Sequence, residues 1–168
     1  MSNLERLPVR TVANILKSNG HQSPVIELSE TARTAEDAAA ALGVAVGAIV
    51  KTLLFIVAND KEQIPVVALV SGDGMCDTNA LLSVTGLDGE VKRPNAHQVK
   101  SLTGYSIGGV SPLGLPSNIQ VFIDTTLNNF DEIWSAAGHP HCVFKSSYSQ
   151  LLEYTGATPS SQLLKYEA

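Results

Sequence analysis

The chain has 168 residues, the usual length of one domain. Its hydrophobic share of 44% and charged share of 16% exclude an intrinsically disordered protein. Eleven basic and sixteen acidic residues give a net charge of −5 at pH 7. This balance argues against a protein that coats nucleic acid through a broad basic face, although it allows a local pocket for one nucleotide end.

In chain order, hydrophobic periodicity predicts a helix at 9–18, a strand at 23–28, a helix at 34–43, strands at 49–58 and 63–71, a helix at 79–84, a strand at 90–93, a helix at 95–102, strands at 119–124 and 142–145, and a helix at 146–154. Residues 130–138 fit a short strand or one helical turn. Pro65 must lie at the start of its strand or on an edge. Because helices and strands interleave and no repeat or linker interrupts them, we expect an α/β (α+β) fold, with residues 1–168 forming a single domain around a mixed sheet.

Two cysteines, Cys76 and Cys142, are too few for a disulfide framework and lack metal-site spacing. Free thiols fit a reducing compartment. The N-terminal residues lack the apolar segment of a signal peptide, and the most apolar run, 44–58, is too short to cross a bilayer. We therefore expect a cytoplasmic protein that binds no membrane and carries no metal or cofactor.

Lys51 lies inside an apolar strand, where an ammonium group is costly unless it reaches water, a partner or a ligand. A long side chain can extend to the edge of the sheet and keep its charge hydrated. Alternatively, the ammonium can donate into a cleft, toward a phosphate or carbonyl oxygen. The residues alone leave both interpretations open.

A glycine-rich segment, GYSIGGVSPLGLP, covers residues 104–116. Around Gly108 and Gly109 the backbone amides can approach a ligand closely, where they would bind an anion or an oxyanion. The spacing matches neither a Walker loop nor a dinucleotide fingerprint, so a plain connecting loop is the alternative. Ser111 precedes Pro112 outside any Gly-x-Ser-x-Gly elbow, which leaves the segment without a predicted nucleophile.

Two histidines, His139 and His141, flank Pro140 and stand next to Cys142. Zinc is one hypothesis, but a closed site needs four ligands and an open one three. A histidine that donates a hydrogen bond or carries a proton in a cleft fits the pattern better. Exposed histidines in a surface turn remain the other interpretation.

Four segments together resemble the sequence motifs of one protein family: TAEDAAAALG at 34–43, IVKTLLF at 49–55, LTGYSIGGVSPLG at 102–114 and AGHP at 137–140. In this order they resemble the YbaK/ProX-type aminoacyl-tRNA deacylases, whose domain also occurs as the editing insertion of bacterial prolyl-tRNA synthetases. The resemblance covers about residues 8–157. It implies a mixed, strongly curved central sheet with flanking helices. It also implies a hydrolase that cleaves, in trans, the ester of a mischarged tRNA, with tRNA(Pro) or a related tRNA as the expected RNA.

The resemblance also implies roles for individual residues. Lys51 matches the hallmark functional lysine near the 3′-terminal adenosine or the ester, and Gly109, His139 and His141 are the other catalytic candidates. Which of the two histidines is functional stays open. The implied substrate-binding residues are Thr52, Gly108, Val110, Ser111, Pro112 and Gly138. The expected partner is the 3′-terminal adenosine end of an aminoacyl-tRNA, with a synthetase as an optional partner, no DNA, and a monomer or weak dimer.

The family reaction is similar to substrate-assisted systems, in which a ribose hydroxyl of the RNA helps to position water. That similarity fits the lack of a predicted nucleophile. The chain departs from the family pattern at Asn79, where many members carry a lysine, and this departure indicates a different amino-acid specificity. Two alternatives stay open: a catalytically silent module that binds a nucleotide or RNA end, and a small-molecule or zinc-dependent esterase that uses His139, His141 and Cys142.

Overall fold

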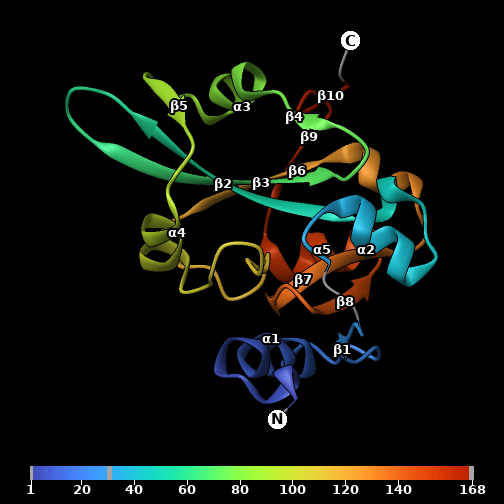
Figure 1. Cartoon of the computed structure of the whole chain (residues 1–168). Coiled ribbons are helices and arrows are strands. Elements are labelled where there is room, and N and C mark those ends of the chain that lie inside the picture. Colours follow the sequence, from blue (N-terminus) through green and yellow to red (C-terminus); the bar gives the residue numbers. More distant parts are fainter. Residues whose placement is uncertain (1, 30–31, 167–168) are drawn as a thin grey trace.

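A five-stranded mixed sheet forms the centre of the computed structural model, which describes residues 2–29 and 32–166 (Figure 1). Its strands lie in the order β5 (Glu90–Lys92), β2 (Val50–Ala58), β3 (Gln63–Ser71), β6 (Gln120–Asp124) and β9 (Thr158–Ser160). β2 runs antiparallel to β3 and β5, whereas β6 runs parallel to β3 and β9. The mixed α+β architecture expected from the sequence is therefore confirmed.

Two smaller sheets complete the β structure. One has the order β1 (Ile26–Glu27), β8 (Cys142–Ser146) and β7 (Ile133–His139), and the other pairs β4 (Met75–Cys76) with β10 (Leu164–Lys165). A β-bulge interrupts β7 between Ala136 and His139. A single bridge between Ile49 and Trp134 brings β7 to the beginning of β2, so the smaller sheet approaches the central one at that point.

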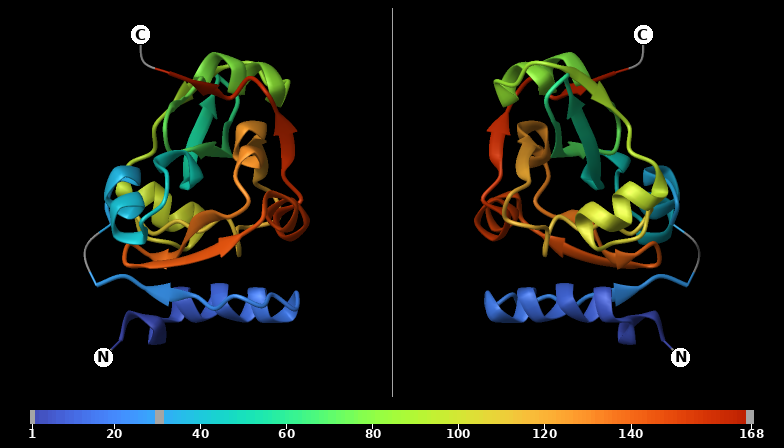
Figure 2. Two further views of the ribbon diagram at one scale, coloured as in Figure 1. Left: turned by 90° about the vertical axis from the view of Figure 1, so that its right-hand side faces the viewer. Right: turned by 90° about the vertical axis from the view of Figure 1, so that its left-hand side faces the viewer.

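The helices are α1 (Leu7–Ser18), α2 (Ala35–Leu42), α3 (Thr78–Thr85), α4 (Ala96–Thr103) and α5 (Tyr148–Thr155), with 3₁₀ turns at Asn3–Glu5, Val46–Ala48 and Thr125–Asn129. α1 lies along β7 and β8, on the side away from the central sheet (Figures 1 and 2). Among the residues described, no helix is both long and apolar enough to cross a membrane.

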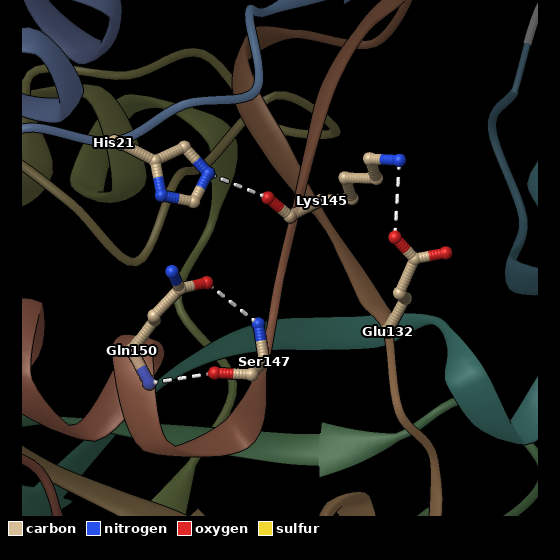
Figure 3. A network of polar contacts seen from close by, with 5 residues as sticks. All are labelled: His21, Glu132, Lys145, Ser147 and Gln150. Carbon is tan, nitrogen blue, oxygen red and sulfur yellow. Dashed lines mark hydrogen bonds and ion pairs between the residues drawn. The ribbon is translucent and has the colours of Figure 1, made fainter.

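The helix ends follow the local sequence. The side chains of Thr34, Asp77, Asn95 and Ser147 each accept a hydrogen bond from a backbone N–H in the first turn of their helix. Each of these helices ends at a glycine in the left-handed conformation. The helix expected to begin at Ser146 has Ser147 as its cap, and Ser147 makes a capping box with Gln150 (Figure 3).

The sheet is buried on both faces, which explains why β2 and β3 read as continuous apolar runs. Leu54 and Leu69 pack into one cluster with α1, β7 and β8, whereas Phe55 and Val70 pack into a second cluster with α3 and the C-terminal segment. Burying each such side chain contributes about 1.5–3 kcal/mol. The burial of both faces holds β2, and with it Lys51, in a fixed position.

Candidate active site

A cavity of about 500 Å³ lies along the outer edge of β2. β5 pairs with β2 only from Ile56 to Ala58, and the bridge to Trp134 lies before the strand begins. Between these two points the described residues place no strand against the outer edge of β2. The cavity is lined from four directions: residues 32–36, Ala38 and Leu42 around α2, Ile49 and residues 50–54 of β2, Arg93, Pro94 and Val99 before and in α4, and parts of the glycine-rich segment, β7 and β8.

The strand register turns backbone groups of β2 toward this cavity. The N–H of Gly72 donates to the carbonyl of Ile49 at 2.7 Å, which sets the alternation of hydrogen bonds between β2 and β3. By that alternation the backbone N–H and C=O of Lys51 form hydrogen bonds with β3. The backbone N–H and C=O of Thr52 and of Leu54 point the other way, toward the free edge. The cavity therefore has a row of backbone donors and acceptors along one wall.

Lys51 is half-buried and lines the cavity. Its Nζ donates to the carbonyl of Gly74 at 2.6 Å, in the turn between β3 and β4. This contact uses one of the three ammonium donors and leaves two. The structure combines the two interpretations that the sequence left open. The Lys51 side chain lines the cavity, and its ammonium group donates to a backbone carbonyl.

The glycine-rich segment packs directly against the histidine turn. Gly108 and Val110 line the cavity, and Gly108 has a φ of +88°. A Cβ added to Gly109 would lie 2.8 Å from Cα and 2.9 Å from the backbone N of His139, so only glycine allows this approach. Ser111 and Pro112 are buried outside the cavity lining, and the Ser111 hydroxyl accepts the N–H of Leu113.

In the histidine turn, Pro140 lines the cavity. Its two neighbours, His139 and His141, do not line the cavity. The N–H of His141 donates to Nδ1 of His139 at 3.1 Å. Burial lowers the pKa of His139, and the nearby charges of Arg6 and His141 lower it further. The neutral ring is therefore favoured, with its proton on Nε2 and the lone pair of Nδ1 occupied by the N–H of His141. Gly138, at a φ of +91°, packs against the backbone of Pro8.

Within residues 2–29 and 32–166, no three His, Cys, Asp or Glu side chains gather in a way that could hold a metal ion. His139, His141 and Cys142 therefore do not form the ligand set of the zinc hypothesis. Cys142 is fully buried, and burial raises the pKa of its thiol to about 11.

Sequence reasoning missed several lining residues. Arg33 and Arg93 are exposed cations at the cavity, and neither lay in a motif. Thr52 Oγ1 and Ser135 Oγ are buried without a hydrogen-bond partner in the described part of the chain, and both residues line the cavity. Buried hydroxyls normally find partners, so these two oxygens, which lie beneath the cavity surface, are exceptions.

A polar network anchors the end of β8 (Figure 3). His21 Nε2 lies 2.8 Å from the carbonyl of Lys145, and Nδ1 lies 2.8 Å from the hydroxyl of Tyr154. Because a carbonyl only accepts, Nε2 carries the proton of the neutral ring. Lys145 also pairs with Glu132 at 3.0 Å. This network ties the segment after α1 to the strand that borders the cavity.

Residues 29–154 match the family model described as "Aminoacyl-tRNA editing domain". The chain belongs to this family. The resemblance predicted from the sequence is thereby confirmed.

Three relatives of this editing domain extend the comparison. A solved structure of a candidate trans-editing enzyme for prolyl-tRNA synthetase aligns with a TM-score of 0.83 and 33% identity, covering 95% of this chain and 98% of that one. A candidate Cys-tRNA(Pro)/Cys-tRNA(Cys) deacylase, EbsC of Enterococcus faecalis (strain ATCC 700802 / V583), is 29% identical over 66% of this chain and 65% of its own length. The proline–tRNA ligase of Nitratidesulfovibrio vulgaris (strain DP4) is 40% identical over 57% of this chain, but that match spans only 16% of the ligase.

The editing domain is an aminoacyl-tRNA deacylase, which hydrolyses the ester between an amino acid and the RNA. Ester hydrolysis needs a water molecule and donors for one developing oxyanion. The cavity is lined by Lys51 and by Gly108 of the glycine-rich segment, and the free backbone edge of β2 runs along it.

Proposed function

We propose that this editing domain acts in trans on mischarged tRNA(Pro) or a related tRNA and hydrolyses its ester in the cavity beside β2. One observation carries the proposal: Lys51 and the loop residues Gly108 and Val110, which are far apart in the sequence, line the same cavity. The relatives described as a trans-editing enzyme and as a Cys-tRNA(Pro) deacylase support the choice of RNA.

In the proposed reaction, water attacks the carbonyl carbon of the aminoacyl ester. The carbonyl oxygen becomes an oxyanion, which a free N–H of Lys51 and the backbone amide of Gly108 stabilise, since the N–H of Gly109 is bonded to the carbonyl of Ser106. The bond from the acyl carbon to the ribose oxygen then breaks, and the proton lost by water ends on that ribose oxygen. A neighbouring ribose hydroxyl of the RNA holds the water. The volume of about 500 Å³ suits one aminoacyl group with part of its adenosine.

His139 acts in this scheme from behind the cavity wall. Because its backbone touches Gly109 and its Nδ1 accepts the N–H of His141, it can fix the glycine loop in place. Thr52 has another role: its free-edge backbone N–H and C=O offer hydrogen bonds to the aminoacyl group.

The test measures hydrolysis of Cys-tRNA(Pro) and Ala-tRNA(Pro), with Pro-tRNA(Pro) as the cognate control. Lys51→Met should lower kcat/KM by about 10²–10³-fold, because it removes an oxyanion donor. Lys61→Met is the matched control, because Lys61 is exposed in the β2–β3 turn, outside the cavity lining.

Thermal unfolding of both variants separates lost chemistry from lost folding. If the wild type hydrolyses no mischarged tRNA, the proposed function is wrong. If it hydrolyses one and the folded Lys51→Met variant keeps full activity, the role of Lys51 is wrong.

A further inference from the structure

The charges at the cavity oppose those of the whole chain. The lining contains three basic residues, Arg33, Lys51 and Arg93, and one acidic residue, Glu36. Of the chain's net charge of −5, the lining thus carries +2, and the remaining residues carry −7. Such a local concentration of positive charge in an acidic protein indicates a binding site for an anion.

Arg93 is held in place while its donors stay free. Its guanidinium carbon lies 5.3 Å from the centre of the Phe55 ring, a distance at which a cation is attracted to the ring face. Phe55 shares a face of β2 with Lys51, because side chains two and four positions apart point the same way. Arg93 makes no ion pair with any described residue. Its planar group therefore presents a fork of N–H donors at the cavity that Lys51 also lines.

Arg33 approaches the same cavity from another segment. It precedes Thr34, the cap of α2, much as Arg93 precedes Asn95, the cap of α4. Figure 2 shows α2 and α4 on one face of the molecule, and Figure 1 shows that they stand apart across that face. Both arginines are exposed, whereas Lys51 is half-buried. The cations thus differ in depth: one lies inside the cavity and two stand at its rim.

We propose that Arg33 and Arg93 form a phosphate-binding rim that holds the RNA backbone next to the terminal adenosine; this inference rests on the proposed function. The ester and its ribose must enter the cavity, while the phosphates 5′ of that ribose stay outside, where the rim lies. A guanidinium binds two phosphate oxygens at once. The rim explains how a chain of net charge −5 binds RNA through a few contacts instead of a broad basic face.

The direct test measures binding of a fluorescent single-stranded RNA with the sequence ACCA, followed by anisotropy across a range of salt concentrations. Arg33→Gln and Arg93→Gln should each weaken binding several-fold at low salt. Each should also reduce the slope of log affinity against log salt by about 0.7, the value for one lost contact to a single strand. The matched control is Arg10→Gln, because Arg10 is exposed on α1 and does not line the cavity.

A second measurement compares two substrates that carry the same amino acid: the mischarged tRNA(Pro), and 2′(3′)-O-aminoacyl-adenosine, which has no phosphate. The rim variants should lose kcat/KM on the tRNA only. Equal losses on both substrates, or ACCA binding that matches Arg10→Gln, would overturn the rim. Arg-dependent ACCA binding by a chain that hydrolyses neither substrate would support the rim and refute the deacylase proposal.

Discussion

Replacing Gly109 by alanine tests the contact between the glycine-rich segment and the histidine turn. The new Cβ would lie 2.8 Å from Cα of His139, whereas carbon atoms pack best at about 3.5–4.0 Å, so the two backbones must separate by about 0.7 Å or more. The opposing atoms are backbone, which no side-chain rotation can remove. The φ of Gly109 is not positive, so the whole cost is steric.

Overpacking of this kind costs about 1–3 kcal/mol of unfolding free energy. Because a misplacement near 1 Å can cost about 10²-fold in rate, we expect Gly109→Ala to lower kcat/KM for mischarged tRNA(Pro) by about 10- to 100-fold. Urea unfolding gives the first quantity and a deacylation assay the second.

Gly86→Ala is the control for this experiment. Gly86 has a φ of +69° with nothing within 4 Å of its added Cβ, so this variant should lose about 1–2 kcal/mol and keep its activity. A Gly109→Ala protein with wild-type stability would refute the packing argument. One that is destabilised but fully active would refute the functional importance of the contact.

Three further predictions concern other parts of the site. Gly74→Ala should lower the melting temperature and should lower kcat/KM several-fold. The added Cβ would lie 2.8 Å from a backbone oxygen of β10 and would displace the carbonyl that accepts the hydrogen bond from Lys51. Unchanged kinetics would contradict this prediction. Ser135→Ala should leave the urea midpoint unchanged or raised, because it removes a buried hydroxyl without a partner in the described residues; a clearly lowered midpoint would show that the hydroxyl is satisfied. Burial lowers the pKa of His139, so the unfolded state binds its proton more tightly and stability must fall as pH drops through about 6.5. His139→Gln should lose less stability than the wild type between pH 7.5 and 5.5; a larger loss for His139→Gln would contradict the sign.

Signals within one turn of the chain predicted the helices closely. The helices expected at 34–43 and 95–102 match α2 and α4, whose caps are Thr34 and Asn95, because a cap bonds to a backbone group only two or three residues away. The strands β2 and β3 were equally clear, since their apolar runs are long and β-branched.

Strands that depend on distant partners were predicted less well. Residues 130–138 fitted either a strand or a helical turn, and pairing with β8 makes Ile133–His139 a strand. The strand expected at 23–28 shrinks to Ile26–Glu27, because β8 pairs with only these two residues. β9, which contains Pro159, carries no strand signal of its own and forms against the edge of β6.

The sequence by itself determined the family, the α+β class and most of the residues proposed for the site, because motifs and local hydrogen bonds depend on residues that are close together in the chain. It could not place Lys51 against the carbonyl of Gly74, nor bring Arg33 and Arg93 to one cavity. These juxtapositions depend on the register of β2 with β3 and on the gap that β5 leaves along the edge of β2. Pairings between distant segments decide both, and the −5 charge of the whole chain gives no sign of the positive lining that they assemble.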